Sequence, residues 1–239
     1  MKKSVSLLLA GLMLCGALTG CGGNNSTAEN TDSQTAESTT GTSGAIHVVS
    51  REDGSGTRGA FVELTGVEDD NGDNTTVEAE IANRTDAVLT TVAGNEAAIG
   101  YVSLGSLNDT VKAVTVDGVE ATVDNVKSGD YTLSRPFNIA TKGEPTGVAK
   151  DFINFIMSAD GQAIVGEDYI TVNDNAEAFT SDGSSGHITV GGSSSVSPVM
   201  EQLIEAYKAV NPNAQIDLQT SDSTSGMTGA MDGTFAIGM

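Results

Sequence analysis

The sequence has little of several residue types on which large classes of proteins depend. Its 239 residues include two cysteines, two histidines, four prolines and no tryptophan. Only 11 lysines and arginines face 32 aspartates and glutamates, which gives a formal net charge of −21 at pH 7. A chain this acidic repels the phosphates of nucleic acids, so no nucleic-acid partner is expected. A small anion stays possible, because carboxylates more than about 8 Å away are largely screened at physiological salt.

The scarcity of cysteine and histidine argues against several kinds of site. Cys15 lies in an apolar leader, so the mature chain is expected to keep only Cys21 and to have no internal disulfide. His47 and His187 have no neighbouring cysteine or second histidine, so neither a metal site nor a cofactor is expected. The sequence also lacks a G-x-S-x-G elbow and a Walker A motif, which argues against an enzyme acting on acyl groups or phosphate esters.

Residues 1–20 have the pattern of a bacterial lipoprotein signal peptide. Two lysines precede an apolar core, 5–18, that is too short for an ordinary transmembrane helix. The core ends in L-T-G-C, which resembles a lipobox and implies cleavage before Cys21 and lipid attachment to its thiol. Residues 21–44 are polar and predict a flexible tether, so an extracytoplasmic, membrane-anchored protein is expected. The alternative is a plain signal peptide with an incidental cysteine.

The most informative stretch is 50–59, which is S-R-E-D-G-S-G-T-R-G. It follows an apolar run, 46–49, and precedes a helical pattern, 57–64, so it is expected to turn from a strand into a helix. The first amides of a helix lack internal partners, and the helix dipole adds positive charge there. The stretch therefore predicts a small anion-binding turn.

The side chains of this turn suit an oxyanion. Gly56 lets the backbone approach a ligand closely, and Ser55 and Thr57 supply hydroxyl groups. The planar guanidinium of Arg51 matches two oxygens of one oxyanion. Asp53, two residues further on, is expected to orient Arg51 through an ion pair.

Two distant stretches repeat this composition. G-G-S-S-S-V-S-P, 191–198, follows a short apolar strand and opens a helix expected over 196–210. S-D-S-T-S-G, 221–226, follows a strand expected over 216–219 and opens another helix. Each turn alone also fits an ordinary capped helix. Three such turns in one chain predict a tetrahedral oxyanion bound by several helix N-termini.

These motifs, with the tail I-G-M and the phrase S-R-P-F at 134–137, resemble the phosphate-binding proteins of Pst-type ABC importers. The resemblance covers nearly all of residues 45–239. It implies an α/β, two-lobed periplasmic-binding-protein-like fold of type II, with one lobe over 45–135 and a partial lobe over 136–239. It also implies a receptor, not an enzyme, that binds inorganic phosphate outside the cell and delivers it to the permease and ATPase subunits of an importer.

The resemblance further assigns the phosphate contacts. They are Arg51, Ser55, Gly56, Thr57, Ser194 and Ser223. Ser195 is added from its place in the second turn, and Asp222 is the candidate acceptor for the proton of hydrogen phosphate. The alternative is an acceptor in the element that follows I-G-M in the family, beyond Met239. Sulfate has no proton to donate, so a buried carboxylate would reject it. The turns alone also fit another oxyanion, such as sulfate or molybdate.

The chain departs from the usual family pattern in two ways. The Ser-rich turn usually precedes the R-E-D-G-S-G-T turn, so the reversed order predicts a circular permutation joined through 174–187. The chain ends at I-G-M, 237–239, inside an expected core strand, so one lobe is expected to be incomplete. A truncated lipoprotein that binds nothing is the corresponding alternative.

Two further features are expected to lie outside the site. The acidic segment 68–74 matches several calcium-loop spacings, but Asn74 stands where glycine is required, so a solvated loop is expected. Arg135 lies in a strand expected over 133–141 and is expected to pair on the surface near a hinge.

Overall fold

The computed structural model describes residues 44–239, so the predicted signal peptide and Cys21 lie outside the described residues. Residues 44–239 belong to one compact unit. None of the helices within 44–239 has both the length and the apolar character needed to cross a membrane.

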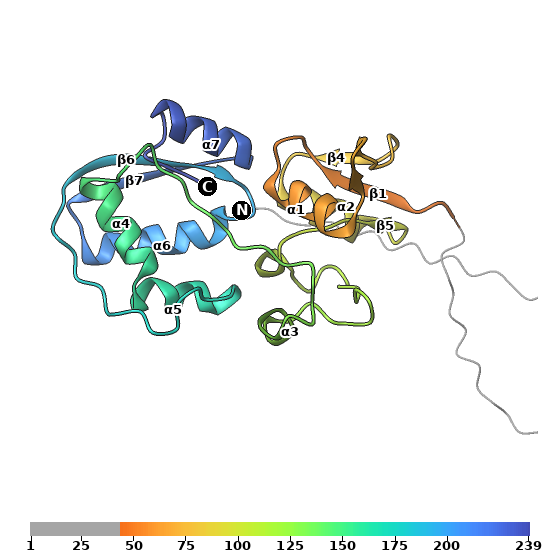
Figure 1. The fold of residues 1–239 in the computed structure, drawn as a ribbon, viewed down its shortest axis with the longest axis horizontal. Helices are drawn as coiled ribbons and strands as arrows, with labels where there is room; N and C mark the ends of the chain where they lie inside the picture. The colour runs from red at the N-terminus through yellow and green to blue at the C-terminus, as the bar shows by residue number, and fades with distance from the viewer. Residues whose placement is uncertain (1–43) are drawn as a thin grey trace, which may run out of the picture. The chain divides into compact units, whose positions relative to one another are not determined.

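The chain alternates strands and helices over most of its described length (Figure 1). In chain order the elements are β1 (His47–Arg51), α1 (Gly56–Thr65), β2 (Glu68–Asp69), β3 (Gly72–Asp73), β4 (Glu80–Ala82), α2 (Thr85–Gly94), β5 (Ala98–Ile99), η1 (Leu104–Ser106), α3 (Val123–Ser128), α4 (Gly147–Met157), α5 (Ala159–Asp168), β6 (Gly186–Ser193), α6 (Ser197–Val210), β7 (Ala214–Ser221), α7 (Ser223–Asp232) and β8 (Ile237–Gly238). The predicted α/β class is confirmed.

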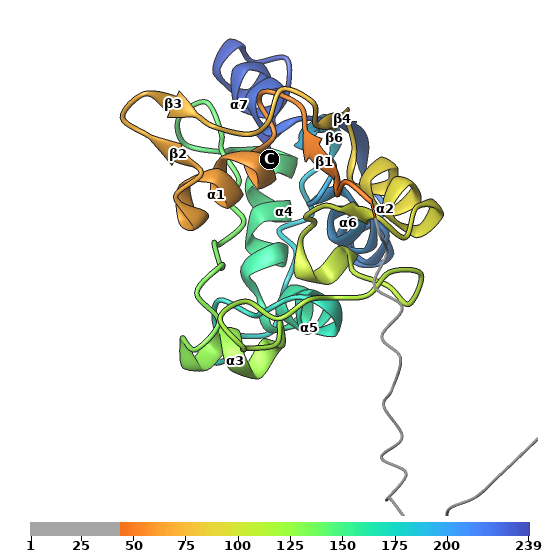
Figure 2. The ribbon, with the colours of Figure 1, turned by 90° about the vertical axis from the view of Figure 1, so that its right-hand side faces the viewer.

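The first sheet has the strand order β4-β1-β5, and both pairings are parallel. Arg51, the last residue of β1, lies opposite Ala82, the last residue of β4. The core under this sheet is small and consists of Val49, Ala82 and Val88 with partly buried neighbours. The β2–β3 hairpin follows α1 and projects from it (Figure 2). Since β1 and β4 are parallel and end in register, the helices that follow them begin side by side.

The second sheet repeats this arrangement in the order β7-β6-β8, again with parallel pairings. Helices α4 and α6 pack on one face of the sheet and α7 on the other (Figure 1). The core on the α4 and α6 side is large and includes Phe152, Val190 and Tyr207, none of them measurably exposed. The N-termini of α6 and α7, which follow the carboxyl ends of β6 and β7, are therefore held in place by a well-packed sheet.

The sequence also predicts helices over 85–93, 146–158 and 159–166 and strands over 98–102 and 111–116. The three helices form within a few residues of these bounds as α2, α4 and α5, but the strands predicted over 111–116 and 133–141 are wrong. Residues 111–116 contribute only a bridge between Val116 and Val119. Residues 133–141 form no regular strand, and only Ala140 pairs, with Gly238 of β8. Pro136 has no amide hydrogen for a ladder, which fits the irregular course of this segment. The two sheets fall on opposite sides of the predicted boundary at 135/136, and the division into lobes stays a prediction.

Candidate oxyanion site

Four helices begin where a parallel strand ends, and their N-termini supply the site. Helix α1 follows β1, and Ser55 caps it by accepting a hydrogen bond from the Arg58 amide at 3.3 Å. Helix α2 follows β4 and begins at Thr85. Helices α6 and α7 follow β6 and β7. Free first-turn amides and the helix dipole make each of these ends favourable for negative charge.

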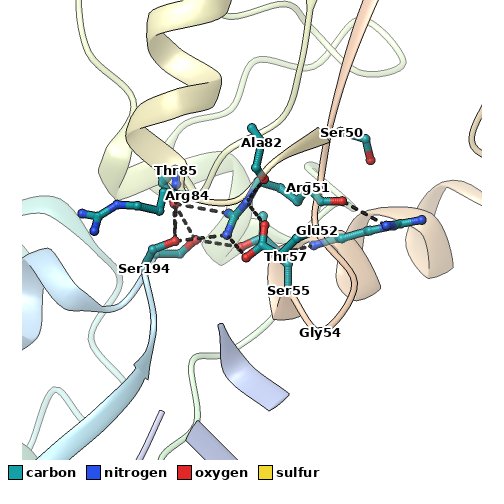
Figure 3. A network of polar contacts seen from close by, with 12 residues as sticks. Ser50, Arg51, Glu52, Gly54, Ser55, Thr57, Ala82, Arg84, Thr85 and Ser194 are labelled. Atoms are coloured by element: carbon teal, nitrogen blue, oxygen red, sulfur yellow. Dashed lines mark hydrogen bonds and ion pairs between the residues drawn. The ribbon is translucent and has the colours of Figure 1, made fainter. Parts of the chain in front are cut away.

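Arg51 is the central side chain of the site and is only 1% exposed (Figure 3). Its Nε donates to Glu52 Oε2 at 2.8 Å and to the Ala82 carbonyl at 3.2 Å. Its Nη2 donates to Glu52 Oε1 at 2.9 Å and to Ser194 Oγ at 3.1 Å. Its Nη1 donates to Thr85 Oγ1 at 3.3 Å. One edge of the guanidinium is thus held by a carboxylate, and its outer end faces hydroxyl groups.

The hydroxyl groups form one network with the guanidinium (Figure 3). Thr57 Oγ1 lies 2.8 Å from Ser195 Oγ, which in turn lies 3.1 Å from Thr85 Oγ1. Ser194 Oγ lies 3.3 Å from Thr85 Oγ1. Ser194, Ser195 and Thr85 are all buried. Residues from the first and the second sheet therefore meet in a buried cluster of donors.

The N-termini of α1 and α7 also lie against each other. A Cβ added to Gly56 would stand 2.7 Å from Ser223 Oγ, so a larger residue at position 56 would displace the Ser223 side chain. The Thr224 amide donates to the Gly54 carbonyl at 3.1 Å. The structure thus brings Arg51, Thr57, Ser194 and Ser195 into one network, with Ser55, Gly56 and Ser223 at its border.

The two predicted carboxylates lie elsewhere than expected. The predicted pair between Asp53 and Arg51 is not formed, because Asp53 follows β1 on an exposed turn and reaches Arg58 at 2.6 Å instead. Asp222 caps α7 and accepts hydrogen bonds from the Ser225 amide at 2.9 Å and the Ser225 hydroxyl at 2.6 Å. Burial would raise the pKa of Asp222, but these hydrogen bonds hold it below its usual value. Asp222 is therefore ionised at neutral pH, and both of its carboxylate oxygens accept hydrogen bonds from Ser225.

Sequence reasoning missed Glu52 and Thr85. Glu52 is part of the quoted motif, but only the observed backbone course shows that it, rather than Asp53, reaches Arg51. Thr85 opens a helix that the sequence predicted, but the strand before it, β4, has three residues and no strong local signal. Its place beside Arg51 comes from the pairing of β4 with β1.

The features placed outside the site stay outside it. Asp73, in the acidic segment, pairs with Arg58 at 2.8 Å, and Arg135 pairs with Glu63 on α1. Among residues 44–239, no group of three or more His, Cys, Asp or Glu side chains is arranged to hold a metal ion.

The family model of the PBP superfamily domain matches residues 25–160. Phosphate-binding protein PstS 2 of Streptococcus agalactiae serotype V is 47% identical over 244 residues, covering 99% of this chain and 79% of that protein. The protein of the same name from Streptococcus pneumoniae serotype 4 is 44% identical over 245 residues and is matched over 81% of its length.

A solved structure is similar as well. The crystal structure of a phosphate ABC transporter phosphate-binding protein from Streptococcus pneumoniae TIGR4 has a TM-score of 0.64 and 47% identity, covering 82% of this chain and 78% of that chain. The predicted permutation relative to other family members stays a prediction.

Proposed function

Because the chain belongs to the PBP superfamily and, within it, to the PstS phosphate-binding proteins, we propose that it binds inorganic phosphate outside the cell and delivers it to an ABC importer. The partners would be the permease and ATPase subunits of that importer. Its relatives are phosphate-binding proteins, one of them from an ABC transporter, and the proposed role is binding without catalysis. The observation that carries the proposal is the buried network in which Arg51 donates to the hydroxyls of Ser194 and Thr85. Ser195 links the Thr85 hydroxyl to that of Thr57.

The chemistry of this network suits a tetrahedral oxyanion. The network combines one guanidinium, several hydroxyl donors and the free amides of helix N-termini, all of which can donate to phosphate oxygens. A hydrogen bond to a charged group contributes roughly 1.5–3 kcal/mol, whereas a typical neutral one contributes about 1 kcal/mol. Exchanging hydroxyl–hydroxyl bonds for hydroxyl–phosphate bonds is therefore favourable. Several such exchanges can support micromolar binding, about −8 kcal/mol.

The proposed contacts come from three turns. They are Arg51, Ser55, Gly56 and Thr57 from the first, Ser194 and Ser195 from the second, and Ser223 from the third. We assign the proton of hydrogen phosphate to Asp222, whose lowered pKa supports an ionised acceptor next to Ser223. Such an acceptor would disfavour sulfate, which has no proton to donate. Asp53 is not included, because it pairs with Arg58.

A lipid anchor on Cys21 is also part of the proposal. Its support is the L-T-G-C sequence that ends the apolar leader. An anchor of two acyl chains holds a receptor stably at the membrane, whereas one chain is marginal. Metabolic labelling with palmitate tests this assignment. Label should enter the wild-type chain and be absent from Cys21→Ser.

Equilibrium binding of labelled phosphate to the full chain in detergent, with sulfate as competitor, tests the function. We expect micromolar binding that resists sulfate and is lost in Arg51→Ala. Arg135→Ala, which removes a surface arginine paired with Glu63, is the matched control and should bind normally. Equal competition by sulfate would identify a general oxyanion receptor. Absence of binding by a chain that circular dichroism shows to be folded would contradict the proposal.

A further inference from the structure

We propose that Thr85, at the N-terminus of α2, is a further phosphate-binding residue and that the β4–α2 turn is a fourth arm of the site. This inference rests on the proposed function. The inference adds a fourth turn to the three turns already proposed. The β4–α2 turn, A-N-R-T, contains neither serine nor glycine, so its composition does not resemble that of the other three.

The position of Thr85 in the hydrogen-bonded network carries the inference. Its hydroxyl lies 3.3 Å from Arg51 Nη1, 3.3 Å from Ser194 Oγ and 3.1 Å from Ser195 Oγ. Its side chain thus touches three of the groups proposed to bind the anion. Thr85 is only 5% exposed and faces this cluster rather than solvent (Figure 3).

The backbone of α2 points at the same cluster. Its N-cap residue, Arg84, makes no side-chain capping bond, so the cap leaves the first-turn amides available. The Thr85 amide donates to Ser194 Oγ at 3.3 Å, across 109 positions of sequence. This amide and the Thr85 hydroxyl therefore present two donors from one residue. Helix α2 has ten residues, long enough for its dipole to favour an anion at that end.

The location of this turn is fixed by two independent contacts. Ala82 pairs with Arg51 in the parallel register of β4 and β1. The Ala82 carbonyl also accepts a hydrogen bond from Arg51 Nε at 3.2 Å. Since the same arginine contacts Ala82 at one edge and Thr85 at its outer end, the start of α2 is held at a set distance from the guanidinium. A preformed donor of this kind binds an anion without a large ordering cost.

The hydroxyl of Thr85 can be removed without changing the shape of its side chain. Thr85→Val replaces the hydroxyl with a methyl group, and Thr85→Ser keeps the hydroxyl. Thr90→Val is the matched control, because Thr90 lies on the exposed side of the same helix and donates to the Asp86 carbonyl at 2.8 Å. Phosphate binding to the full chain in detergent is measured by equilibrium dialysis, with thermal melting as a check of folding. If Thr85→Val does not fold, Thr85→Ala takes its place in the comparison.

We expect Thr85→Val to weaken phosphate binding by about tenfold or more, the loss of one hydrogen bond to a charged ligand. Thr85→Ser should stay within about threefold of wild type, and Thr90→Val should match wild type. Wild-type affinity in Thr85→Val would overturn the role of Thr85 and leave the proposed function standing. Equal losses in Thr85→Val and Thr85→Ser would also overturn it, because packing and not the hydroxyl would be responsible. A folded wild-type chain that binds no phosphate would overturn both proposals.

Discussion

Arg51 and Glu52 are neighbours in the sequence and form a two-point ion pair. Arg51 Nε lies 2.8 Å from Glu52 Oε2, and Nη2 lies 2.9 Å from Oε1. The arginine is buried and the side chain of Glu52 is 18% exposed. The carboxylate compensates the charge of a guanidinium that would otherwise be costly to bury. It also leaves the Nη1 and Nη2 end of Arg51 directed at the hydroxyl cluster.

Removing Glu52 should therefore destabilise the chain in a way that phosphate relieves. We expect Glu52→Ala to lower the free energy of unfolding by about 1–3 kcal/mol, since Arg51 is left without its counter-ion and Glu52 is partly exposed. Bound phosphate can replace the lost negative charge, so saturating phosphate should raise the melting temperature more in Glu52→Ala than in wild type. Glu63→Ala, which breaks a surface pair, should change stability by about 1 kcal/mol or less. If phosphate raised the melting temperatures of Glu52→Ala and wild type equally, phosphate would not be replacing the lost charge of Glu52.

Arg51→Lys should bind phosphate at least about a hundredfold more weakly than wild type, despite keeping the charge. A lysine ammonium cannot hold both oxygens of Glu52 while also reaching Ser194 and Thr85. Isothermal titration of wild type, Arg51→Lys and Arg135→Lys measures the effect. Arg135→Lys keeps a surface charge beside Glu63 and should bind as wild type does. Tight binding by Arg51→Lys would show that charge alone is sufficient.

Gly192→Ala should be strongly destabilising, by about 3 kcal/mol or more in the free energy of unfolding. Gly192 has a φ of +135°, and an added Cβ would stand 2.0 Å from the Met239 carbonyl oxygen. Gly183→Ala is the control, because Gly183 has a φ of +75° with open space around it. Its expected cost is only about 1 kcal/mol, that of the left-handed backbone. Denaturant titration compares the two variants, and similar costs would mean that the contact of Gly192 with Met239 is relaxed easily.

The site was predictable from sequence where local composition determines local structure. The segments at the ends of β1, β6 and β7 are rich in glycine, serine and threonine, and a strand turns into a helix at each of them. This local composition predicted the residues that these three turns bring to the site. The β4–α2 turn carries no such composition. Thr85 reaches the site only because β4 pairs with β1 in a register that ends at Ala82 and Arg51. That pairing joins segments about thirty residues apart, and the local sequence does not indicate that β4 pairs with β1.

The fold shows the same division between local and long-range information. Helices α4 and α6 were predicted because their apolar residues recur at helical spacing. In the structure these residues pack against the second sheet. The predicted strand over 111–116 is wrong, although the segment is rich in valine and threonine, which are typical of strands. Val114 in this segment is 59% exposed. A strand pattern forms a strand only where a partner strand offers hydrogen bonds and a core face.

Asp151 on α4 is a buried carboxylate with a structural role. It accepts hydrogen bonds from Tyr207 Oη at 2.7 Å, from Ser181 Oγ at 2.7 Å and from the Asp182 amide at 3.0 Å. These bonds join α4, α6 and the segment before β6. Burial alone would raise the pKa of Asp151, but the hydrogen bonds from Asp182, Ser181 and Tyr207 lower it below its usual value. Burial, and after it the hydrogen bond to Asp151, raises the pKa of Tyr207.

The stability contributed by Asp151 should depend on pH in a defined direction. Because its pKa in the folded chain is lowered, the carboxylate contributes full stability above the unfolded value of about 3.9, and the contribution is lost as the pH falls through the lower folded pKa. Asp151→Asn should therefore cost about 2–4 kcal/mol at pH 7 and progressively less below pH 4. Asp232→Asn, at an exposed site, should cost little at either pH. Urea denaturation of the three proteins from pH 7 to pH 2.5 measures these differences. A cost for Asp151→Asn that stays constant down to pH 2.5 would mean that the folded chain does not hold this carboxylate ionised.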